Sequence, residues 1–252
     1  MTKSIVLVTG GSRGIGAAAS LCAAELGYGV VVNYVSNKAA ADDIVSQIIN
    51  TGGEAIAVQG DVQFEADVLK IYAACDEFGT LVGLVNNAGV VDRPQRVDEM
   101  SVERLTRMYA INVIGAFVCV REAVKRMSTR HGGRGGAIVN IGSAASKLGA
   151  PGQYVDYAAS KGAIDTMTFG LSLEVAGEGI RVNAVRPGII DTDIHASGGL
   201  PDRVAQLEGK LPMKRAGTAD EVAKAIKWLL SDDASYTTGA ILDVSGGRAI
   251  LP

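Results

Sequence analysis

The chain has 252 residues, with 24 lysines and arginines against 27 aspartates and glutamates and a formal net charge of −3. Because no block of basic residues stands out, the charge pattern argues against a nucleic-acid partner. No apolar run reaches the roughly 18 residues that a membrane helix requires, and the run at 5–8 is too short for a signal peptide, so we expect a cytoplasmic protein without a membrane partner.

Short runs rich in β-branched residues alternate with longer stretches of helical pattern. Strands are predicted at residues 4–9, 29–34, 55–59, 81–85, 136–141, 181–185 and 240–244. Helices are predicted at 14–26, 37–50, 102–127, 154–176 and 219–230. The strands are continuously apolar rather than alternating, which is typical of strands buried on both faces of a parallel sheet.

The sustained strand–helix alternation predicts the fold class as α/β: a doubly wound parallel sheet between two helical layers, in a single domain over residues 1–252. A chain of this size buries roughly 70–75% of its unfolded surface, so its core needs neither a disulfide nor a metal, and no metal site is predicted. Cys22, Cys75 and Cys119 lie far apart in apolar helical stretches and are expected to be reduced and buried. Ligands of doubly wound sheets bind beyond the carboxyl ends of the strands, so the residues that follow each strand carry the functional information.

The first predicted strand runs into a glycine-rich loop, TGGSRGIG at residues 9–16. Gly10, Gly14 and Gly16 are spaced differently from the usual G-x-G-x-x-G fingerprint, but the physical reasoning is shared. Glycines permit a tight turn and a close approach of the backbone to a pyrophosphate, and the helix that follows directs free N–H groups at the anion. A loop in this place predicts a dinucleotide site; the alternative is a glycine-rich turn without a ligand.

The end of the second predicted strand bears on the choice of nucleotide. A cofactor with a free 2′-hydroxyl usually meets an Asp or Glu about 20 residues beyond the glycine loop. Here the first acid after that strand is Asp42, already within a helix, whereas Arg13 in the loop suits a phosphate. This pattern predicts NADP(H) rather than NAD(H), with Asn33, Ser36 and Lys38 as further contacts; the alternative is Arg13 as a solvated surface charge.

Further motifs follow the later strands in order. They are Asp61-Val62 after the third, Asn86-Asn87-Ala88-Gly89 after the fourth, Asn112 in the long helix, Ser143 after the fifth, Tyr157 and Lys161 in the next helix, and Pro187-Gly188 after the sixth. With these motifs the chain resembles, over its whole length, the short-chain dehydrogenase/reductase family in the subclass of this chain length. The resemblance implies a Rossmann fold and is nearest to NADP-dependent carbonyl and 3-oxoacyl reductases and to glucose or ribitol dehydrogenases.

Tyr157 and Lys161 are four residues apart and share a helix face. A tyrosine is a poor base at neutral pH, but a nearby ammonium lowers the pKa of its hydroxyl, so the pair can give a proton to a carbonyl oxygen or take one from an alcohol. From the residues alone Ser143, Ser146 and Ser160 are all candidates to orient the substrate oxygen. The resemblance selects Ser143, and it implies a catalytic role for Ser143, Tyr157 and Lys161.

The resemblance also implies roles for the remaining site residues. Asn112 would disturb its helix locally and hold a water that links Lys161 to solvent, as a fourth catalytic residue; the alternative is a cap or an exposed amide. One ring face of the nicotinamide would be blocked, and the family transfers the pro-S hydride. The predicted cofactor-binding set is Gly10, Ser12, Arg13, Gly14, Ile15, Gly16, Asn33, Ser36, Asp61, Val62, Asn87, Ala88, Gly89, Tyr157, Lys161, Pro187, Gly188, Ile190 and Thr192.

Residues 191–213 interrupt the strand–helix alternation and contain Gly198, Gly199 and two prolines. The family uses this stretch as a substrate lid, which glycines would allow to close; the alternative is a surface loop. His195 lies in it, and its role is left open. The apolar C-terminal stretch 239–252, with the long helices, implies the homotetramer that the family usually forms.

The predicted function is an NADP-dependent oxidoreductase that moves a hydride between the nicotinamide and a small-molecule carbonyl or secondary alcohol. The substrate is left open among 3-oxoacyl thioesters, sugars or polyols, steroid-like ketones and small ketones. A catalytically silent NADP-binding regulator is the alternative, and the presence of Ser143, Tyr157 and Lys161 argues against it. An epimerase or dehydratase of nucleotide sugars would need a longer chain, and enoyl reductases space their Tyr and Lys further apart.

Overall fold

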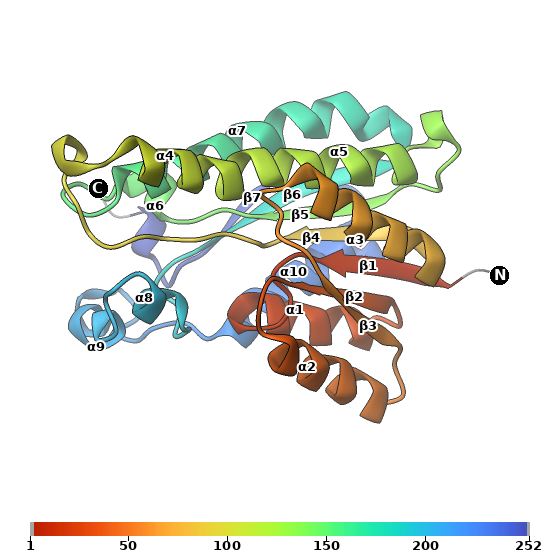
Figure 1. The fold of residues 1–252 in the computed structure, drawn as a ribbon, viewed down its shortest axis with the longest axis horizontal. Coiled ribbons are helices and arrows are strands. Elements are labelled where there is room, and N and C mark those ends of the chain that lie inside the picture. The colour runs from red at the N-terminus through yellow and green to blue at the C-terminus, as the bar shows by residue number, and fades with distance from the viewer. Residues whose placement is uncertain (1–2, 251–252) are drawn as a thin grey trace.

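A seven-stranded, wholly parallel sheet forms the centre of the computed structural model, which describes residues 3–250 (Figure 1). The strand order is β3-β2-β1-β4-β5-β6-β7. The strands are β1 (Ser4–Val8), β2 (Gly29–Tyr34), β3 (Ala55–Gln59), β4 (Thr80–Asn86), β5 (Gly136–Ile141), β6 (Ile180–Pro187) and β7 (Ile241–Val244). This order is that of a Rossmann fold and confirms the predicted fold class.

Ten α-helices are found in the described part of the chain. They are α1 (Gly14–Glu25), α2 (Lys38–Asn50), α3 (Glu65–Phe78), α4 (Val102–Tyr109), α5 (Ala116–Met127), α6 (Ala145–Leu148), α7 (Val155–Val175), α8 (Ile194–Ser197), α9 (Arg203–Leu207) and α10 (Ala219–Leu230). A π-helical turn, η2 (Ala110–Gly115), joins α4 to α5. The 3-10 helices are η1 (Val97–Glu99), η3 (Thr129–His131), η4 (Ala176–Glu178), η5 (Glu208–Lys210), η6 (Asp232–Ala234) and η7 (Arg248–Ile250).

The helices cover both faces of the sheet. Helices α3, α4, α5 and α7 lie on one face, and α1, α2 and α10 lie on the other (Figure 1). Along β1, Ile5 and Leu7 pack into the first core, while Val6 and Val8 pack into the second. The continuous apolar runs of the strands therefore fill two cores at once, which is why alternation is absent from the sequence.

Two strands extend into motifs that were predicted as site residues. β4 continues to Asn86, which pairs in register with Asn140 of β5. β6 continues to Pro187, which pairs with Val244 of β7. These carboxyl ends are held in the sheet, so the segments that follow them leave from fixed points.

The remaining expectations about the chain's general character can be compared with the structure directly. Cys22, Cys75 and Cys119 are buried and unbonded to one another, as predicted. Burial raises the pKa of the Cys75 and Cys119 thiols to about 12. Within residues 3–250, no helix combines the length and the apolar character needed to cross a membrane.

Candidate active site

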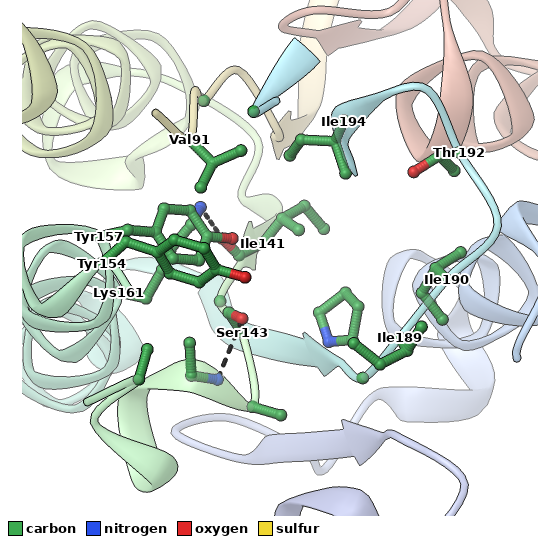
Figure 2. Close-up of a pocket in the computed structure, with 18 of the residues that line it drawn as sticks. Val91, Ile141, Ser143, Tyr154, Tyr157, Lys161, Ile189, Ile190, Thr192 and Ile194 are labelled. Atoms are coloured by element: carbon green, nitrogen blue, oxygen red, sulfur yellow. Dashed lines mark hydrogen bonds between the residues drawn. The ribbon is translucent and has the colours of Figure 1, made fainter. Parts of the chain in front are cut away.

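A cavity opens at the carboxyl ends of the strands, near the point where β1 and β4 lie side by side and the strand order reverses. Its volume is about 1090 Å³, including the part that opens to solvent. Figure 2 shows Tyr154 and Tyr157 facing Ile190 and Thr192 across the open space. The predicted site residues that line the cavity are Ile15, Asn87, Gly89, Ser143, Tyr157, Lys161, Pro187, Gly188, Ile190 and Thr192.

The loop between β1 and α1 has a backbone shape that favours glycine. Gly10 and Gly14 have φ angles of +59° and +52°. A Cβ at Gly16 would lie 2.2 Å from the carbonyl oxygen of Gly10, which no side chain tolerates. The first turn of α1 has no acidic residue, and within the described chain its N-cap, Arg13, makes no capping bond through its side chain. The positive end of α1 therefore points at this loop without a compensating charge.

Asn33 was predicted to contact the cofactor, but the structure buries its side chain against the glycine loop. It is 1% exposed, and its Oδ1 accepts a hydrogen bond from the Gly10 N–H at 3.2 Å. Its Nδ2 donates to the carbonyl oxygens of Gly60, at 2.9 Å, and Val58, at 3.3 Å. Because both polar atoms are engaged inside the protein, Asn33 braces the glycine loop against β3 instead of presenting itself to a ligand.

The other polar side chains at the ends of β1 and β2 are more accessible. Arg13 and Ser36 are exposed, and Ser12 is half-buried. Lys38 pairs with Asp42 at 2.6 Å, so the first acid after β2 is already engaged. Among the residues that the structure describes, Arg13 forms no ion pair, and its guanidinium remains available to an external anion.

Asp61 and Val62 follow β3 and lie beside the cavity rather than in its wall. The carboxylate of Asp61 accepts hydrogen bonds from the backbone and side-chain amides of Gln63. Val62 is buried, and a Cβ at Gly115 would lie 2.6 Å from its carbonyl oxygen. This close contact fixes the end of β3 against the π turn η2.

A set of hydrogen bonds joins the glycine loop to the end of β4. The Thr9 Oγ1 accepts hydrogen bonds from the N–H groups of Asn87, at 2.9 Å, and Ala88, at 3.0 Å. The Asn87 Nδ2 donates to the carbonyl oxygens of Thr9 and Gly10, at 2.9 and 3.1 Å. Thr9 was not predicted as a site residue, yet it holds two neighbouring strands in register at the edge of the cavity.

Asn112 lies in the π turn η2, where a local disturbance of the helix was predicted. It is 1% exposed. Its Oδ1 accepts from the Val90 N–H at 2.8 Å, and its Nδ2 donates to the Val90 carbonyl at 2.9 Å and to the Ser160 Oγ at 3.2 Å. A Cβ built on Gly89 would lie 3.4 Å from both the Asn112 Oδ1 and the Lys161 Nζ. The Asn112 amide therefore fixes the segment after β4 at a place that Lys161 also reaches.

Ser143 is the one of the three candidate serines that lines the cavity in the described structure. Its Oγ accepts a hydrogen bond from the Ala145 N–H at 3.1 Å (Figure 2), so its own proton can be directed toward Tyr157 in the cavity. The Ser146 hydroxyl donates to the carbonyl oxygen of Ser143 at 2.9 Å, and the Ser160 hydroxyl donates to that of Tyr157 at 2.7 Å. Both alternatives are thus committed to the backbone.

Lys161 is buried and Tyr157 half-buried, and desolvation is the largest influence on the pKa of each. The Lys161 Nζ donates to the Ile141 carbonyl at 2.8 Å (Figure 2), and burial lowers its pKa to about 8, opposed by the Asp165 carboxylate. Burial raises the pKa of Tyr157, opposed by a hydrogen bond with Ser143. The Lys161 Nζ is 5.8 Å from the centre of the Tyr157 ring. Without a bound cofactor the pKa of Tyr157 therefore lies above its usual value, whereas the sequence predicted a lowering by Lys161.

The segment after β6 closes the cavity against the glycine loop. A Cβ at Gly188 would lie 2.8 Å from the Cα of Ser245, so glycine is required for this close packing. A Cβ at Gly14 would lie 3.3 Å from the Thr192 side chain. The glycine loop and the stretch from Pro187 to Thr192 consequently form one continuous wall.

The 191–213 segment contains the short helices α8, α9 and η5. It contributes Thr192, Ile194, Gly198, Leu200 and Arg203 to the cavity wall. The side chain of His195 lies outside the described residues. Three further lining residues, Tyr154, Arg203 and Arg248, were not predicted as site residues, because they come from segments far apart in sequence and belong to no motif.

The chain is similar to known oxidoreductases in both sequence and structure. A family profile described as enoyl-(acyl carrier protein) reductase matches residues 10–249. The oxidoreductase YgfF of Escherichia coli is 54% identical, over 97% of this chain and 100% of its own length. A 3-oxoacyl-[acyl-carrier-protein] reductase of Synechocystis is 40% identical, over 100% and 99% of the two chains. The structure of a short-chain type dehydrogenase/reductase from Mycobacterium marinum is 32% identical, with a TM-score of 0.90 over 98% of this chain and 95% of its own.

Fold and site together define a Rossmann-fold oxidoreductase. The chain belongs to the short-chain dehydrogenase/reductase family, whose members use nicotinamide cofactors. The names of similar proteins cover different substrates: glucose 1-dehydrogenase 2 of Bacillus subtilis, for example, is 37% identical over 100% of this chain and 97% of its own length.

Proposed function

We propose that this protein is an NADP-dependent oxidoreductase that interconverts a carbonyl compound and a secondary alcohol, with Tyr157 as the acid and base. One observation carries the proposal. Ser143, from the loop after β5, and Tyr157 and Lys161, from α7, line one cavity beside the glycine loop at the carboxyl ends of the strands.

The shape of the glycine loop fits a nicotinamide dinucleotide. Gly10 and Gly14 adopt positive φ angles, and a Cβ at Gly16 would collide with the loop backbone, so the loop can approach a pyrophosphate closely at the start of α1. The exposed guanidinium of Arg13 favours a 2′-phosphate, with Ser36 as a second contact. The residues proposed to hold the rest of the cofactor are Ser12, Ile15, Asp61, Val62, Asn87, Ala88, Gly89, Tyr157, Lys161, Pro187, Gly188, Ile190 and Thr192.

The residues of the cavity supply the proton and orient the substrate. When bound, the nicotinamide supplies the hydride for reduction or accepts it in oxidation. Since burial raises its pKa, the Tyr157 hydroxyl is protonated at neutral pH and can donate to a carbonyl oxygen. When substrate is bound, Ser143 donates its hydroxyl proton to the same oxygen instead of to Tyr157 and so fixes the position of that oxygen. Lys161 is poised to exchange protons near neutral pH, and Asn112 holds the backbone beside it.

The test follows NADPH and NADH oxidation by absorbance across ketones, diketones, quinones, oxoacyl thioesters and sugars, with Tyr157→Phe as the control. Turnover of a carbonyl that the variant lacks supports the proposal. Tight NADPH binding without turnover on any carbonyl, together with an indifferent variant, would refute it.

The choice of NADP rests on Arg13 and has its own measurement. Charge-assisted hydrogen bonds to a phosphate are worth about 1.5–3 kcal/mol, so Arg13→Ala should weaken NADPH binding about 10- to 100-fold and leave NADH binding unchanged. Equal effects on the two nucleotides would assign Arg13 to the fold rather than to the phosphate.

Two further features belong to this proposal. We take 191–213 as a lid that closes over the substrate, since five of its residues line the cavity. We also propose a homotetramer built on the long helices, because Ile114, Phe117, Phe169 and Leu173 of η2, α5 and α7 are exposed apolar side chains. Sedimentation equilibrium of the full chain measures the assembly directly, and a monomer would refute it.

A further inference from the structure

Two arginines that belong to no motif, Arg203 of α9 and Arg248 of η7, line the same cavity as Tyr157 and Ser143. The guanidinium carbon of Arg203 lies 5.1 Å from the centre of the Tyr154 ring, in a cation–π contact. The Tyr154 ring packs edge-to-face against the Tyr157 ring, with centres 6.0 Å apart. One aromatic ring therefore separates Arg203 from the tyrosine proposed as the proton donor.

Arg203 is buried without a carboxylate partner among residues 3–250. It is 8% exposed, and no described side chain forms an ion pair with it. Two other largely buried arginines show the ordinary arrangement: Arg104 pairs with Asp156 at 2.8 Å, and Arg186 pairs with Asp165 at 2.9 Å. Because a buried charge is costly unless it is paired, Arg203 is well placed for an anion that comes from outside the chain.

The electrostatics of Arg248 point the same way. Burial and the neighbouring positive charge of Arg203 both lower the pKa of Arg248, and only Tyr154 acts against them. The two guanidinium groups thus repel each other. An anion bound to both would remove that repulsion.

Apart from its polar groups, the cavity wall is rich in apolar side chains. Val91, Leu148, Ile194 and Leu200 line it, and none can bind a charge. A ligand that reaches from Tyr157 to the arginines therefore needs an apolar middle section.

The arginines lie on the substrate side of the cavity rather than beside the glycine loop. Thr192 contacts the position that a Cβ on Gly14 would occupy, and it faces Tyr154 from the opposite side of the cavity (Figure 2). Since Arg203 stacks on Tyr154, the cofactor phosphates and the two arginines belong to opposite walls.

We propose that Arg203 and Arg248 together bind an oxyanion, carboxylate or phosphate, at the far end of the carbonyl substrate. The substrate class is then an acidic ketone, or the matching hydroxy acid, with an apolar spacer between its two functional groups. The planar fork of arginine suits both oxyanions. This inference rests on the proposed function, because it takes Tyr157 as the reacting end.

The experiment compares matched substrates in the full-length protein with NADPH. The pairs are 4-oxopentanoate with its methyl ester, and 4-acetylbenzoate with its methyl ester; 4-acetylphenyl phosphate separates the two oxyanions. The variants are Arg203→Gln and Arg248→Gln. Arg134→Gln, which removes an exposed arginine outside the cavity, is the matched control.

The readout is the ratio of kcat/KM for an acid to that for its ester. The wild type and the Arg134 variant should prefer the acid, or the phosphate, over the ester about 10- to 100-fold. In Arg203→Gln and in Arg248→Gln the ratio of acid to ester kcat/KM should fall close to one, while the ester is still turned over. A purely structural role for the arginines would lower both rates together and leave the ratio unchanged, which would overturn the inference.

Failure of the proposed function gives a different result. If no ketone is turned over, calorimetric titration of the NADPH-loaded protein with 4-acetylbenzoate still tests the arginines. Binding that Arg203→Gln weakens about 10-fold or more would support the anion site alone. Absence of binding in the wild type would overturn the anion site as well.

Discussion

Replacing Lys161 by methionine should change how the stability of this protein depends on pH. Burial lowers the pKa of Lys161 from 10.5 to about 8 in the folded chain. Between these values the unfolded chain holds a proton that the folded chain has released, so folding stability rises with pH across this window. At pH 8 and below, the folded state carries the full cost of a buried ammonium, which a difference of this size puts at about 3 kcal/mol.

The methionine variant has no such proton. Its free energy of unfolding relative to that of the wild type should therefore be higher at pH 7.5 than at pH 10.5, by about 3 kcal/mol. Loss of the hydrogen bond to the Ile141 carbonyl costs about 1–3 kcal/mol, but this cost does not vary with pH. Only the pH dependence of the difference, and not its absolute value, reports the buried charge.

Urea unfolding of the cofactor-free proteins at pH 7.5, 8.5, 9.5 and 10.5 gives this difference. Lys210→Met, at an exposed lysine, provides the baseline. If the difference in unfolding free energy between the variant and the wild type stays constant with pH to within about 0.5 kcal/mol, burial of the Lys161 ammonium does not destabilise the fold. That result would also refute the inference that Lys161 exchanges protons near neutral pH.

Two further outcomes follow from the packing around the site. Arg104→Met should lower the free energy of unfolding by about 3–5 kcal/mol, because it leaves the buried carboxylate of Asp156 unpaired. Urea unfolding should show a smaller loss of stability when Asp156→Leu is added to Arg104→Met. If the losses of the two single variants simply add, the pairing is contradicted. Gly16→Ala should abolish NADPH binding in a fluorescence titration, since its Cβ would lie 2.2 Å from the Gly10 carbonyl oxygen, while Gly170→Ala, which meets no atom within 4 Å, should bind as the wild type does.

The fold was predictable because each central strand is a short, continuous apolar run and longer helical stretches separate the strands. The limits of the long helix at 102–127 follow from the residue pattern, but a disturbance at Asn112 was predicted only through the family resemblance, since one irregular turn leaves the apolar periodicity almost unchanged. Ser143 and Tyr157, which belong to motifs, line one cavity in the structure, because Ser143 follows β5 and Tyr157 lies at the start of the next long helix.

What the sequence could not reveal depends on contacts between distant segments. Asn33 stands at a strand end like a ligand-binding residue, but its amide is used by the backbones of Gly10 and Gly60. The raised pKa of Tyr157 depends on the depth of burial, which no spacing indicates. Arg203 and Arg248 are 45 positions apart in the numbering and meet only through the folded cavity.

The π turn η2 also determines how many residues must lie between helices α4 and α5. A π turn is an α-helix with one residue inserted, and each residue of an α-helix turns the chain by roughly 100°. Helix α5 is anchored in the core by Cys119, Ala123 and Met127, so deleting one residue from η2 would rotate α4 instead. Arg104 would then turn away from its partner on α7. The helical run can therefore accept substitutions along its exposed side but cannot be shortened by one residue without disrupting the packing next to Tyr157.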